Sequence, residues 1–253
     1  MTPGPTPVLR LDEIGSTNAE ARRRAEAGET GPLWITTLRQ TAGRGRRGRA
    51  WSTGDGNLAA TLLITTDKPA MEAAQVAFVA ALAVSDLLSG YAWPGAVTIK
   101  WPNDVLLEGR KASGVLIESG AAPHGGLWLA VGVGVNLADA PDDVERPAAR
   151  LVDCMAPGIA PPTRDEALDA LSSAFARRWT QWHAEGFEPV LDAWSRRAAG
   201  IPGPCEARLD AETVGGVAEG LDRDGALLVR LEDGTVRRIT AGDVFFGSEN
   251  ASA

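Results

Sequence analysis

The hydrophobic pattern of the chain changes its period several times, which predicts strands and helices in alternation. Val8–Ile14, Leu33–Leu38 and Asn57–Thr65 are short runs of mostly apolar and β-branched residues, which is typical of strands. In Met71–Leu88 the apolar residues recur at spacings of three and four, which predicts a buried amphipathic helix. The order of these segments predicts an α/β (α+β) fold.

Two more helices are expected from their end signals. Ser16 or Thr17 is a suitable N-cap for a short helix after the first strand, and Gly28 ends it. A longer helical segment, Arg164–Ala199, lies later in the chain and is expected to break near Gly186. These helices would flank the sheet that the strands form.

The second half of the chain predicts further strands and then a small β domain. Between the helical segments lie strand-like runs and a hairpin: Val97–Trp101, Asp104–Leu107, Ser113–Glu118 and Leu127–Asn136. The composition shifts at 200–204, and short runs separated by Asp-Gly turns follow: Glu206–Leu209, Thr213–Leu221, Ala226–Leu231 and Val236–Thr240. We therefore expect an α/β domain over 1–200 and an all-β domain over 201–253.

Composition narrows the functional classes that the chain can belong to. Two cysteines 51 residues apart and two isolated histidines give neither a disulfide framework nor a zinc site. No apolar run approaches the roughly 20 residues that a membrane span needs, and the N-terminus lacks the apolar core of a signal peptide. A formal net charge of -8 disfavours a dedicated nucleic-acid binder. A reducing, cytoplasmic setting without a membrane is expected.

One loop between two expected strands is strongly basic. Gln40–Trp51 reads QTAGRGRRGRAW, in which glycines alternate with Arg44, Arg46, Arg47 and Arg49. Glycine lets backbone N–H groups approach an anion closely, and arginine supplies paired donors for phosphate or carboxylate. The composition favours a binding loop for a small anionic ligand. A solvated basic loop or a nucleic-acid contact would have the same composition.

Three further motifs place polar or small residues at the ends of expected strands. KWPND spans Lys100–Asp104, KASGVLIE spans Lys111–Glu118 and GVGVNL spans Gly132–Leu137. The polar residues of KWPND could point into a cleft or simply form a turn. Lys111 could pair with a ligand anion or be a solvated charge at a strand end. Glycines inside the other two motifs favour a close approach by a ligand or by the backbone.

These motifs, together with GSTN at Gly15–Asn18, resemble the catalytic domain of biotin–protein ligases. The resemblance rests on five motifs in the family's order and spacing, and it covers roughly residues 10–140. The C-terminal β segment is similar to the family's SH3-like domain, with less specific signals. The resemblance implies a mixed sheet flanked by helices, related to class II aminoacyl-tRNA synthetase cores, followed by a small SH3-like β-barrel.

The activity that the resemblance implies has two steps and needs no covalent enzyme nucleophile. Biotin is first activated by ATP to biotinyl-5′-AMP. It is then transferred to a lysine of a biotin carboxyl carrier protein or domain of an acyl-CoA or pyruvate carboxylase. The work of such an enzyme is positioning and electrostatic stabilisation.

The resemblance also implies which residues bind biotin. They would contact the ureido group, the bicyclic ring and the carboxylate: Ser16, Thr17, Asn18, Gln40, Arg44, Gly45, Arg46, Lys111, Gly114 and Gly132. Of these, Lys111, Arg44 and Arg46 are the implied catalytic cations, which neutralise charge during adenylation. Asp104 is the fourth implied catalytic residue and would orient or deprotonate the acceptor lysine.

A second group of residues is implied on the ATP side: Arg47, Arg49, Trp51, Asn103 and Asn136. Trp51 would pack on the adenine, and Asn136 would reach the phosphates. Mg²⁺ is expected because the charge of the triphosphate must be neutralised, but the sequence names no metal ligands.

The remaining expectations concern partners and alternatives. Only 14 residues precede GSTN, so we expect no helix-turn-helix domain and no sequence-specific DNA binding. The oligomeric state stays open between a monomer and a weak, ligand-promoted homodimer. A lipoate–protein ligase, a non-enzymatic nucleic-acid binder and an inactive homologue are the alternatives. The polar cluster at Ser16–Asn18 with Gln40 favours a ureido ring over a dithiolane.

Ligand binding is expected to close the arginine–glycine loop and exclude water from the intermediate. Saturating biotin should therefore slow tryptic cleavage after the arginines of Gln40–Trp51. Peptide mapping by mass spectrometry measures the rate at each bond, with cleavage outside the loop as the internal control. Equal loop cleavage with and without biotin would contradict ordering by the ligand.

Overall fold

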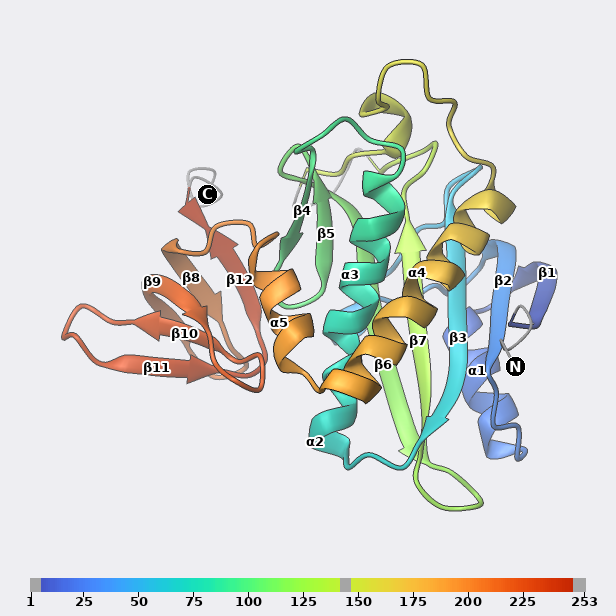
Figure 1. Cartoon of the computed structure of the whole chain (residues 1–253), viewed down its shortest axis with the longest axis horizontal. Coiled ribbons are helices and arrows are strands. Elements are labelled where there is room, and N and C mark those ends of the chain that lie inside the picture. Colours follow the sequence, from blue (N-terminus) through green and yellow to red (C-terminus); the bar gives the residue numbers. More distant parts are fainter. Residues whose placement is uncertain (1–5, 142–146, 248–253) are drawn as a thin grey trace.

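The computed structural model describes residues 6–141 and 147–247, which form one large and one small β-sheet (Figure 1). The large sheet has the order β1-β2-β3-β7-β6-β5-β4. Its strands are β1 Val8–Ile14, β2 Leu33–Gln40, β3 Leu58–Thr66, β4 Val97–Lys100, β5 Asp104–Leu107, β6 Arg110–Ala121 and β7 Leu127–Val135. Only β1 and β2 run parallel, with α1 (Thr17–Glu26) connecting them, so the sheet is mixed. The predicted strands and hairpin are confirmed.

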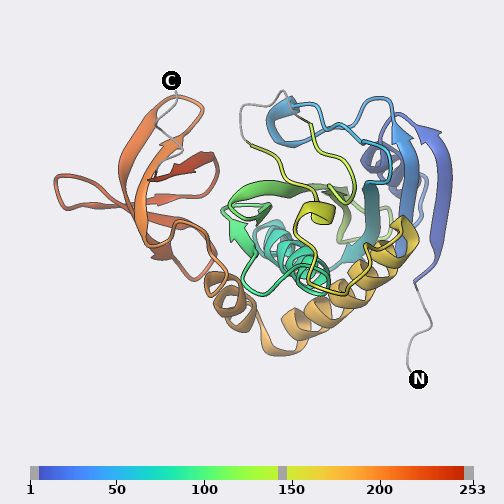
Figure 2. The same ribbon diagram turned by 90° about the horizontal axis from the view of Figure 1, so that it is seen from above.

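Helices cover the two faces of the large sheet unequally. The helices after α1 are α2 Ala70–Ala73, α3 Val76–Ser89, α4 Arg164–Glu185 and α5 Glu188–Ser195. Figure 2 shows α3 between the sheet and α4, with α1 and the arginine–glycine loop on the opposite face. α1 packs with its own small cluster, in which Ala21 and Ala25 contact Ile35 and Leu63. The face with α1 is therefore the one that helices cover less.

The α3 segment is apolar enough to resemble a membrane span. By length and composition Ala70–Ser89 passes such a test, contrary to the expectation that no run would approach that length. In the fold, 67% of the most apolar window is buried. α3 is apolar because it packs between the sheet and α4, so its hydropathy is accounted for by the protein core.

The long helical segment breaks where the sequence predicted. α4 begins with a capping box, in which the Thr163 hydroxyl accepts from Glu166 N and Glu166 accepts from Thr163 N. It ends at Gly186, whose φ of 84° suits glycine. α5 then starts with Pro189 in its first turn. The expected break near Gly186 is confirmed.

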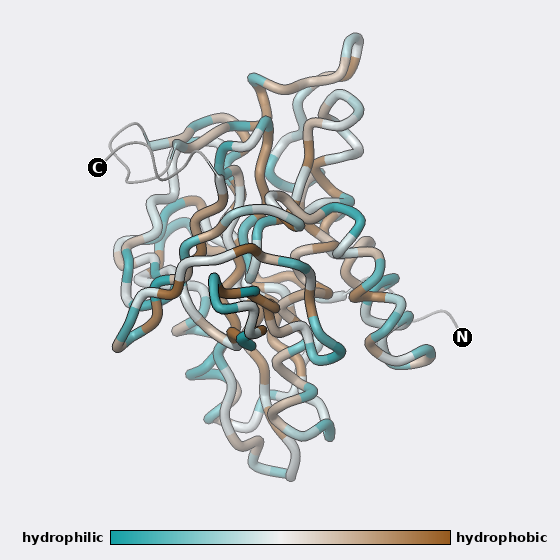
Figure 3. Tube along the Cα trace, turned by 90° about the vertical axis from the view of Figure 1, so that its left-hand side faces the viewer, coloured by the Kyte–Doolittle hydropathy of each residue, from teal (hydrophilic) through white to brown (hydrophobic). Residues whose placement is uncertain are grey.

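The small sheet is antiparallel, with the order β11-β10-β9-β8-β12. Its strands are β8 Gly203–Arg208, β9 Thr213–Leu221, β10 Leu227–Arg230, β11 Val236–Ile239 and β12 Asp243–Phe246. Burial alternates along β8 and β10, as expected when one face of the sheet is buried, and Figure 3 views the molecule from the side of this sheet.

Sequence analysis missed one strand, β12. Four residues between two glycines are too short a run to give a period, and only pairing with β8 makes them a strand. Phe246 of β12 packs tightly against Gly200, where a Cβ would lie 2.4 Å from the phenyl ring. The missed strand matters because it begins with Asp243, which faces the large domain.

Specific contacts join the small sheet to the large one. The Trp101 indole donates to the Gly225 carbonyl over 3.0 Å, and a Cβ at Gly225 would lie 2.5 Å from the ring of Phe78. Lys100 lies 5.6 Å from the ring of Phe245. The turn after β4 and the small sheet are thus packed together, which fixes the position of KWPND. The domain boundary at residue 200 remains a prediction.

An ionic junction ties α3 to α4 and to the segment after α5. The Asp86 carboxylate accepts from Arg178 Nε over 2.9 Å and from Arg197 Nη2 over 3.1 Å. All three side chains are largely buried. Two partly desolvated cations therefore depend on a single carboxylate.

We expect Asp86→Asn to lower the free energy of unfolding by about 1–3 kcal/mol, because it leaves two poorly solvated guanidinium groups without their anion. Urea denaturation followed by circular dichroism measures this. Glu72→Gln is the matched control, since the pair of Glu72 with Lys68 lies at the surface and its loss should change stability by less than about 0.5 kcal/mol. Equal losses in both variants would contradict a special role for Asp86.

Candidate active site

A cavity of about 420 Å³ opens on the α1 face of the large sheet. Fifteen of the sixteen residues predicted from the motifs line it: Ser16, Thr17, Asn18, Gln40, Arg44, Gly45, Arg46, Arg49, Trp51, Asn103, Asp104, Lys111, Gly114, Gly132 and Asn136. Arg47 is the exception and lines a neighbouring groove instead. Asp243 and Val244 of β12 also line the cavity, so the small sheet contributes to its wall.

A buried polar network forms the end of the cavity beside α1. The Thr17 N–H donates to Gln40 Oε1 over 2.9 Å, and Gln40 Nε2 donates to the Thr53 hydroxyl over 3.2 Å, which fixes the amide. The hydroxyl of Thr61, a fully buried residue of β3, lies 2.8 Å from that of Thr17. Ser16 is the N-cap residue as predicted, but its side chain makes no cap hydrogen bond. Its hydroxyl is thus available to a ligand.

Asn18 is held by the protein on every side. Its Nδ2 donates to Glu118 Oε2 over 2.8 Å, and its Oδ1 accepts from the Thr61 hydroxyl over 2.7 Å. The other oxygen of Glu118 pairs with Arg44 Nη2 at 3.3 Å. Asn18 therefore shapes the cavity while its own polar atoms are engaged. Glu118 and Thr61 were missed because nothing in the sequence places a strand residue opposite α1.

Three glycines of β6 and β7 form the floor of the cavity. Gly114 and Gly134 are paired across the two strands, and the Trp51 ring lies on them, because a Cβ at Gly134 would be 2.2 Å from Trp51 Cε2. A Cβ at Gly132 would lie 2.2 Å from Asn18 Oδ1. The glycines were predicted to allow a close approach by a ligand or by the backbone. In the structure their close neighbours are the side chains of Trp51 and Asn18.

Lys111 is the central cation of the cavity. Its Nζ lies 2.7 Å from Asp104 Oδ1 and 5.8 Å from the centroid of the Trp51 ring. The Asp104 side chain is 10% exposed, so this ion pair is mostly shielded from water. The contact was not foreseen: Lys111 and Asp104 belong to different motifs and are brought together by the pairing of β5 with β6.

The arginine–glycine loop is a short hairpin with a 3₁₀ turn, Arg46–Gly48, at its tip. Backbone N–H groups of Gly45 and Trp51 donate to the carbonyls of Arg49 and Gly43 over 2.7 and 2.9 Å. Three of its arginines line the cavity: Arg44, Arg46 and Arg49. Arg46 donates to Asn103 Oδ1 over 3.1 Å, and burial lowers the pKa of its guanidinium, which Asp243 partly opposes.

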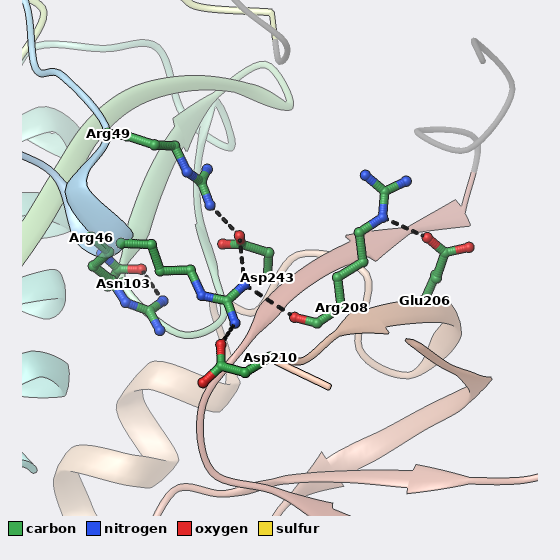
Figure 4. Close-up of polar contacts among 8 residues, drawn as sticks. Arg46, Arg49, Asn103, Glu206, Arg208, Asp210 and Asp243 are labelled. Atoms are coloured by element: carbon green, nitrogen blue, oxygen red, sulfur yellow. Dashed lines mark hydrogen bonds and ion pairs between the residues drawn. The ribbon is translucent and has the colours of Figure 1, made fainter. Parts of the chain in front are cut away.

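Arg47 and Arg49 of the loop pair with the small sheet, and Arg49 lines the cavity as well; Figure 4 shows Arg49 directed at Asp243. Arg47 pairs with Asp210 and with Asp243, whose Oδ2 lies 3.3 Å from Arg47 Nη1. Arg49 pairs with the same oxygen of Asp243. The four arginines of the loop thus divide by partner: Arg44 and Arg46 contact residues of the large sheet and its turns, whereas Arg47 and Arg49 contact the small sheet.

The predicted asparagines also have structural partners. Asn103 Nδ2 donates to the Val115 carbonyl, which leaves Oδ1 to accept from Arg46. Asn136 is 3% exposed and donates from Nδ2 to the Ala149 carbonyl over 3.2 Å, so it holds the segment after 147 beside β6. Both line the cavity, but neither has an unengaged amide nitrogen dedicated to a ligand.

A metal ion would have few protein ligands here. Within 6–141 and 147–247 there is no group of three His, Cys, Asp or Glu side chains that could hold one. Among the described residues, Asp104 and Asp243 are the carboxylates that line the cavity. Mg²⁺ commonly binds through one or two carboxylates together with the phosphates of a substrate. The carboxylates of this cavity fit that mode of binding, and they do not fit a metal site made of protein ligands alone.

Comparisons with known proteins agree along almost the whole chain. A family model described as the biotin/lipoate A/B protein ligase family matches residues 13–136, and one described as the biotin protein ligase C-terminal domain matches 204–247. A biotin--[acetyl-CoA-carboxylase] ligase from Paracoccus denitrificans is 43% identical over 94% of this chain and 99% of its own. The chain belongs to the biotin/lipoate A/B protein ligase family.

Solved structures of ligases share the fold. A biotin protein ligase from Aquifex aeolicus in complex with biotin and ATP superposes with a TM-score of 0.80 at 23% identity, covering 95% of this chain and 99% of that one. One from Leishmania major in complex with biotinyl-5-AMP has a TM-score of 0.64 at 25% identity, covering 94% and 100%. The mixed large sheet with a small antiparallel C-terminal sheet is thus a ligase architecture.

The fit of Gly132 beneath Asn18 can be tested by adding one methyl group. We expect Gly132→Ala to lower the free energy of unfolding by about 1–3 kcal/mol, because the Cβ overlaps an amide that three hydrogen-bonding partners hold in place. Chemical denaturation gives the value. Gly220→Ala in β9 is the control, since its Cβ would meet nothing within 4 Å. A Gly132 variant as stable as this control would contradict the close fit.

Proposed function

We propose that the chain is a biotin–protein ligase, which activates biotin with ATP to biotinyl-5′-AMP and transfers it to a lysine of a carrier domain. The observation that supports this most directly is the convergence of Lys111, Arg44 and Arg46 on one cavity, beside the polar end formed by Ser16 and Gln40. The 43% identical relative from Paracoccus denitrificans supports the same activity.

The polar end of the cavity suits the ureido group of biotin. A ureido group presents one carbonyl acceptor and two N–H donors, so its site needs both donors and acceptors. The Ser16 hydroxyl supplies either role, and the Thr17 hydroxyl and Gln40 lie beside it. In this proposal Asn18 acts through shape, because its amide is already bonded within the protein.

The cations suit the acid end of biotin and the α-phosphate of ATP. In the first step a biotin carboxylate oxygen bonds to the α-phosphorus, the bond to the bridging oxygen breaks, and pyrophosphate leaves. Negative charge crowds at the phosphorus, and Lys111 with Arg44 and Arg46 would stabilise it. Each cation now has a partner in the protein, namely Asp104, Glu118 or Asn103, and would exchange it for substrate oxygens.

In the second step the carrier lysine, as a free amine, attacks the acyl carbon of the adenylate. A C–N bond forms, the C–O bond to the phosphate breaks, AMP leaves and the nitrogen loses a proton. Asp104 is proposed to orient this amine, and its separation of 2.7 Å from Lys111 supports a position beside the reacting carbon. The acceptor is proposed to be a biotin carboxyl carrier protein or domain.

The ATP side is proposed to use Trp51, Asn103, Asn136 and Arg49. The Trp51 ring lies on the glycine floor next to Lys111, so an adenine stacked on it would be near the α-phosphate site. Mg²⁺, held mainly by the phosphates with help from Asp104, would neutralise triphosphate charge. The Arg47 assignment to ATP finds no support, because that side chain faces Asp210 and Asp243.

The finer description of the fold, the cellular location and the oligomeric state are further proposals. We infer that the large domain is related to class II aminoacyl-tRNA synthetase cores and that the small sheet is an SH3-like barrel. Cytoplasmic location, the absence of sequence-specific DNA binding and a monomer or weak ligand-promoted homodimer remain predictions. Both cysteines are free and buried, which agrees with a reducing compartment.

The activity is tested by biotin-dependent exchange of labelled pyrophosphate into ATP, with Mg²⁺ and no acceptor. We expect exchange with biotin and none with lipoate. Lys111→Ala should lower the turnover of exchange by about 10²–10³-fold, because a cation at the developing charge is lost. Lys68→Ala, at the surface beside Glu72, is the control and should exchange normally.

Two outcomes would contradict the proposal. Exchange with lipoate but not with biotin, by folded wild-type protein, would assign the other branch of the family. Full activity of the Lys111 variant would remove Lys111 from the adenylation step while leaving the biotin assignment intact.

A further inference from the structure

Asp243 is a carboxylate of the small sheet that is shared by two arginines of the substrate-binding loop. Its Oδ2 pairs with Arg49 and lies 3.3 Å from Arg47 Nη1 (Figure 4). The side chain is 18% exposed, whereas Asp210, the other partner of Arg47, is 94% exposed. A shielded carboxylate with two cationic partners stabilises a contact more than an exposed pair does. Asp243 is therefore the stronger attachment point.

The backbone of the loop is bent where this attachment occurs. Arg47 has a φ of 55°, a left-handed conformation that is unfavourable for a residue with a Cβ. Glycine would adopt it freely, so an arginine here needs compensation from its side chain. The Arg47 guanidinium supplies contacts to Asp243, to Asp210 and to the Arg208 carbonyl at 3.4 Å. The ion pairs of Arg47 therefore stabilise the left-handed turn that carries it.

This arrangement separates the functions of four neighbouring arginines. With Arg47 and Arg49 paired to Asp243, the hairpin presents Arg44 and Arg46 to the cavity, which Arg49 lines at its edge with the small sheet. Asp243 opposes the lowering of the Arg46 pKa by burial, while Arg46 itself donates a hydrogen bond to Asn103 Oδ1. Without the carboxylate, Arg49 would lose its counter-charge and Arg47 would keep the exposed Asp210, so the repulsion among four cations within six residues would be less well compensated.

We propose that Asp243 is a positioning residue for the adenylation site: it holds Arg47 and Arg49 on the small sheet, so that the loop is closed with Arg44 and Arg46 directed inward. Asp243 acts through the loop and not on the reacting atoms. The C-terminal domain thereby sets the fraction of molecules whose loop is ready to bind. The kinetic consequence rests on the proposed ligase function, whereas the structural one does not.

Limited trypsinolysis without any ligand tests the structural part. In Asp243→Asn the bonds after Arg44 and Arg46 should be cut roughly three- to tenfold faster than in wild type, because cleavage follows the open population of the loop. Arg49→Gln removes the same pair from the other side and retains both bonds, so it should behave alike. Glu219→Gln, which removes an exposed pair with Arg230 in the same sheet, is the matched control and should match wild type.

The dependence of loop cleavage on salt concentration tests the same ion pairs independently. Raising NaCl from low to high concentration should speed loop cleavage in wild type, since partly exposed ion pairs are screened. Asp243→Asn should already be cut fast and respond much less. Circular dichroism and thermal melting of each variant distinguish loop opening from loss of the small sheet, which would also speed cleavage outside the loop.

The kinetic part separates positioning from catalysis. In pyrophosphate exchange Asp243→Asn should raise the KM for biotin by about two- to fivefold with kcat nearly unchanged, because only the competent fraction of the loop changes. Asp243→Glu should restore much of the loss. Unchanged loop cleavage in both Asp243→Asn and Arg49→Gln would overturn the proposal whatever the activity. A fall in kcat alone, with a protected loop, would overturn it in favour of direct contact with the substrate.

Discussion

Mutual repulsion among cations is the constraint around which the proposed active site is built. Lys111, Arg44, Arg46 and Arg49 all line one cavity, an arrangement that is unfavourable without counter-charges. The fold supplies a separate partner to each from a different element: Asp104 at the start of β5, Glu118 from β6, Asn103 from the turn before β5, and Asp243 from β12. These partners keep the cations in place before substrate arrives, which lowers the reorganisation that binding requires.

The second requirement is an open stretch of sheet under those cations. Strands normally cover both faces with side chains, and here Gly114, Gly132 and Gly134 leave the face bare where β6 and β7 meet. Bare backbone would be solvated, but Trp51 and Asn18 cover it closely. The same positions thus serve packing and access. This is why glycine substitutions there affect the cavity and the stability of the sheet together.

The motifs predicted most of the site because each is a short local sequence at a strand end. They located 15 of 16 residues at one cavity, together with the sheet strands that carry them. They could not predict contacts made across the fold. Glu118 stands at the end of a recognised motif, yet its partners Asn18 and Arg44 lie 100 and 74 residues away. Arg47 was assigned with its neighbours, because composition does not reveal which way a side chain leaves a hairpin. Asp243 was not predicted as a site residue because β12, the strand that carries it, was not predicted.

The engaged amide of Asn18 limits how the pocket could be altered to accept other acids. Because Gly132 is already in close contact with that amide, the floor offers no unused depth for a larger ring. Substituting the floor would make the pocket smaller and displace α1. Space for a bulkier biotin analogue would have to come from the wall, by shortening Asn18 together with Thr61, the residue that holds its oxygen. In the proposed ligase, the selectivity of this pocket for ring size would therefore be set by the first turn of a helix.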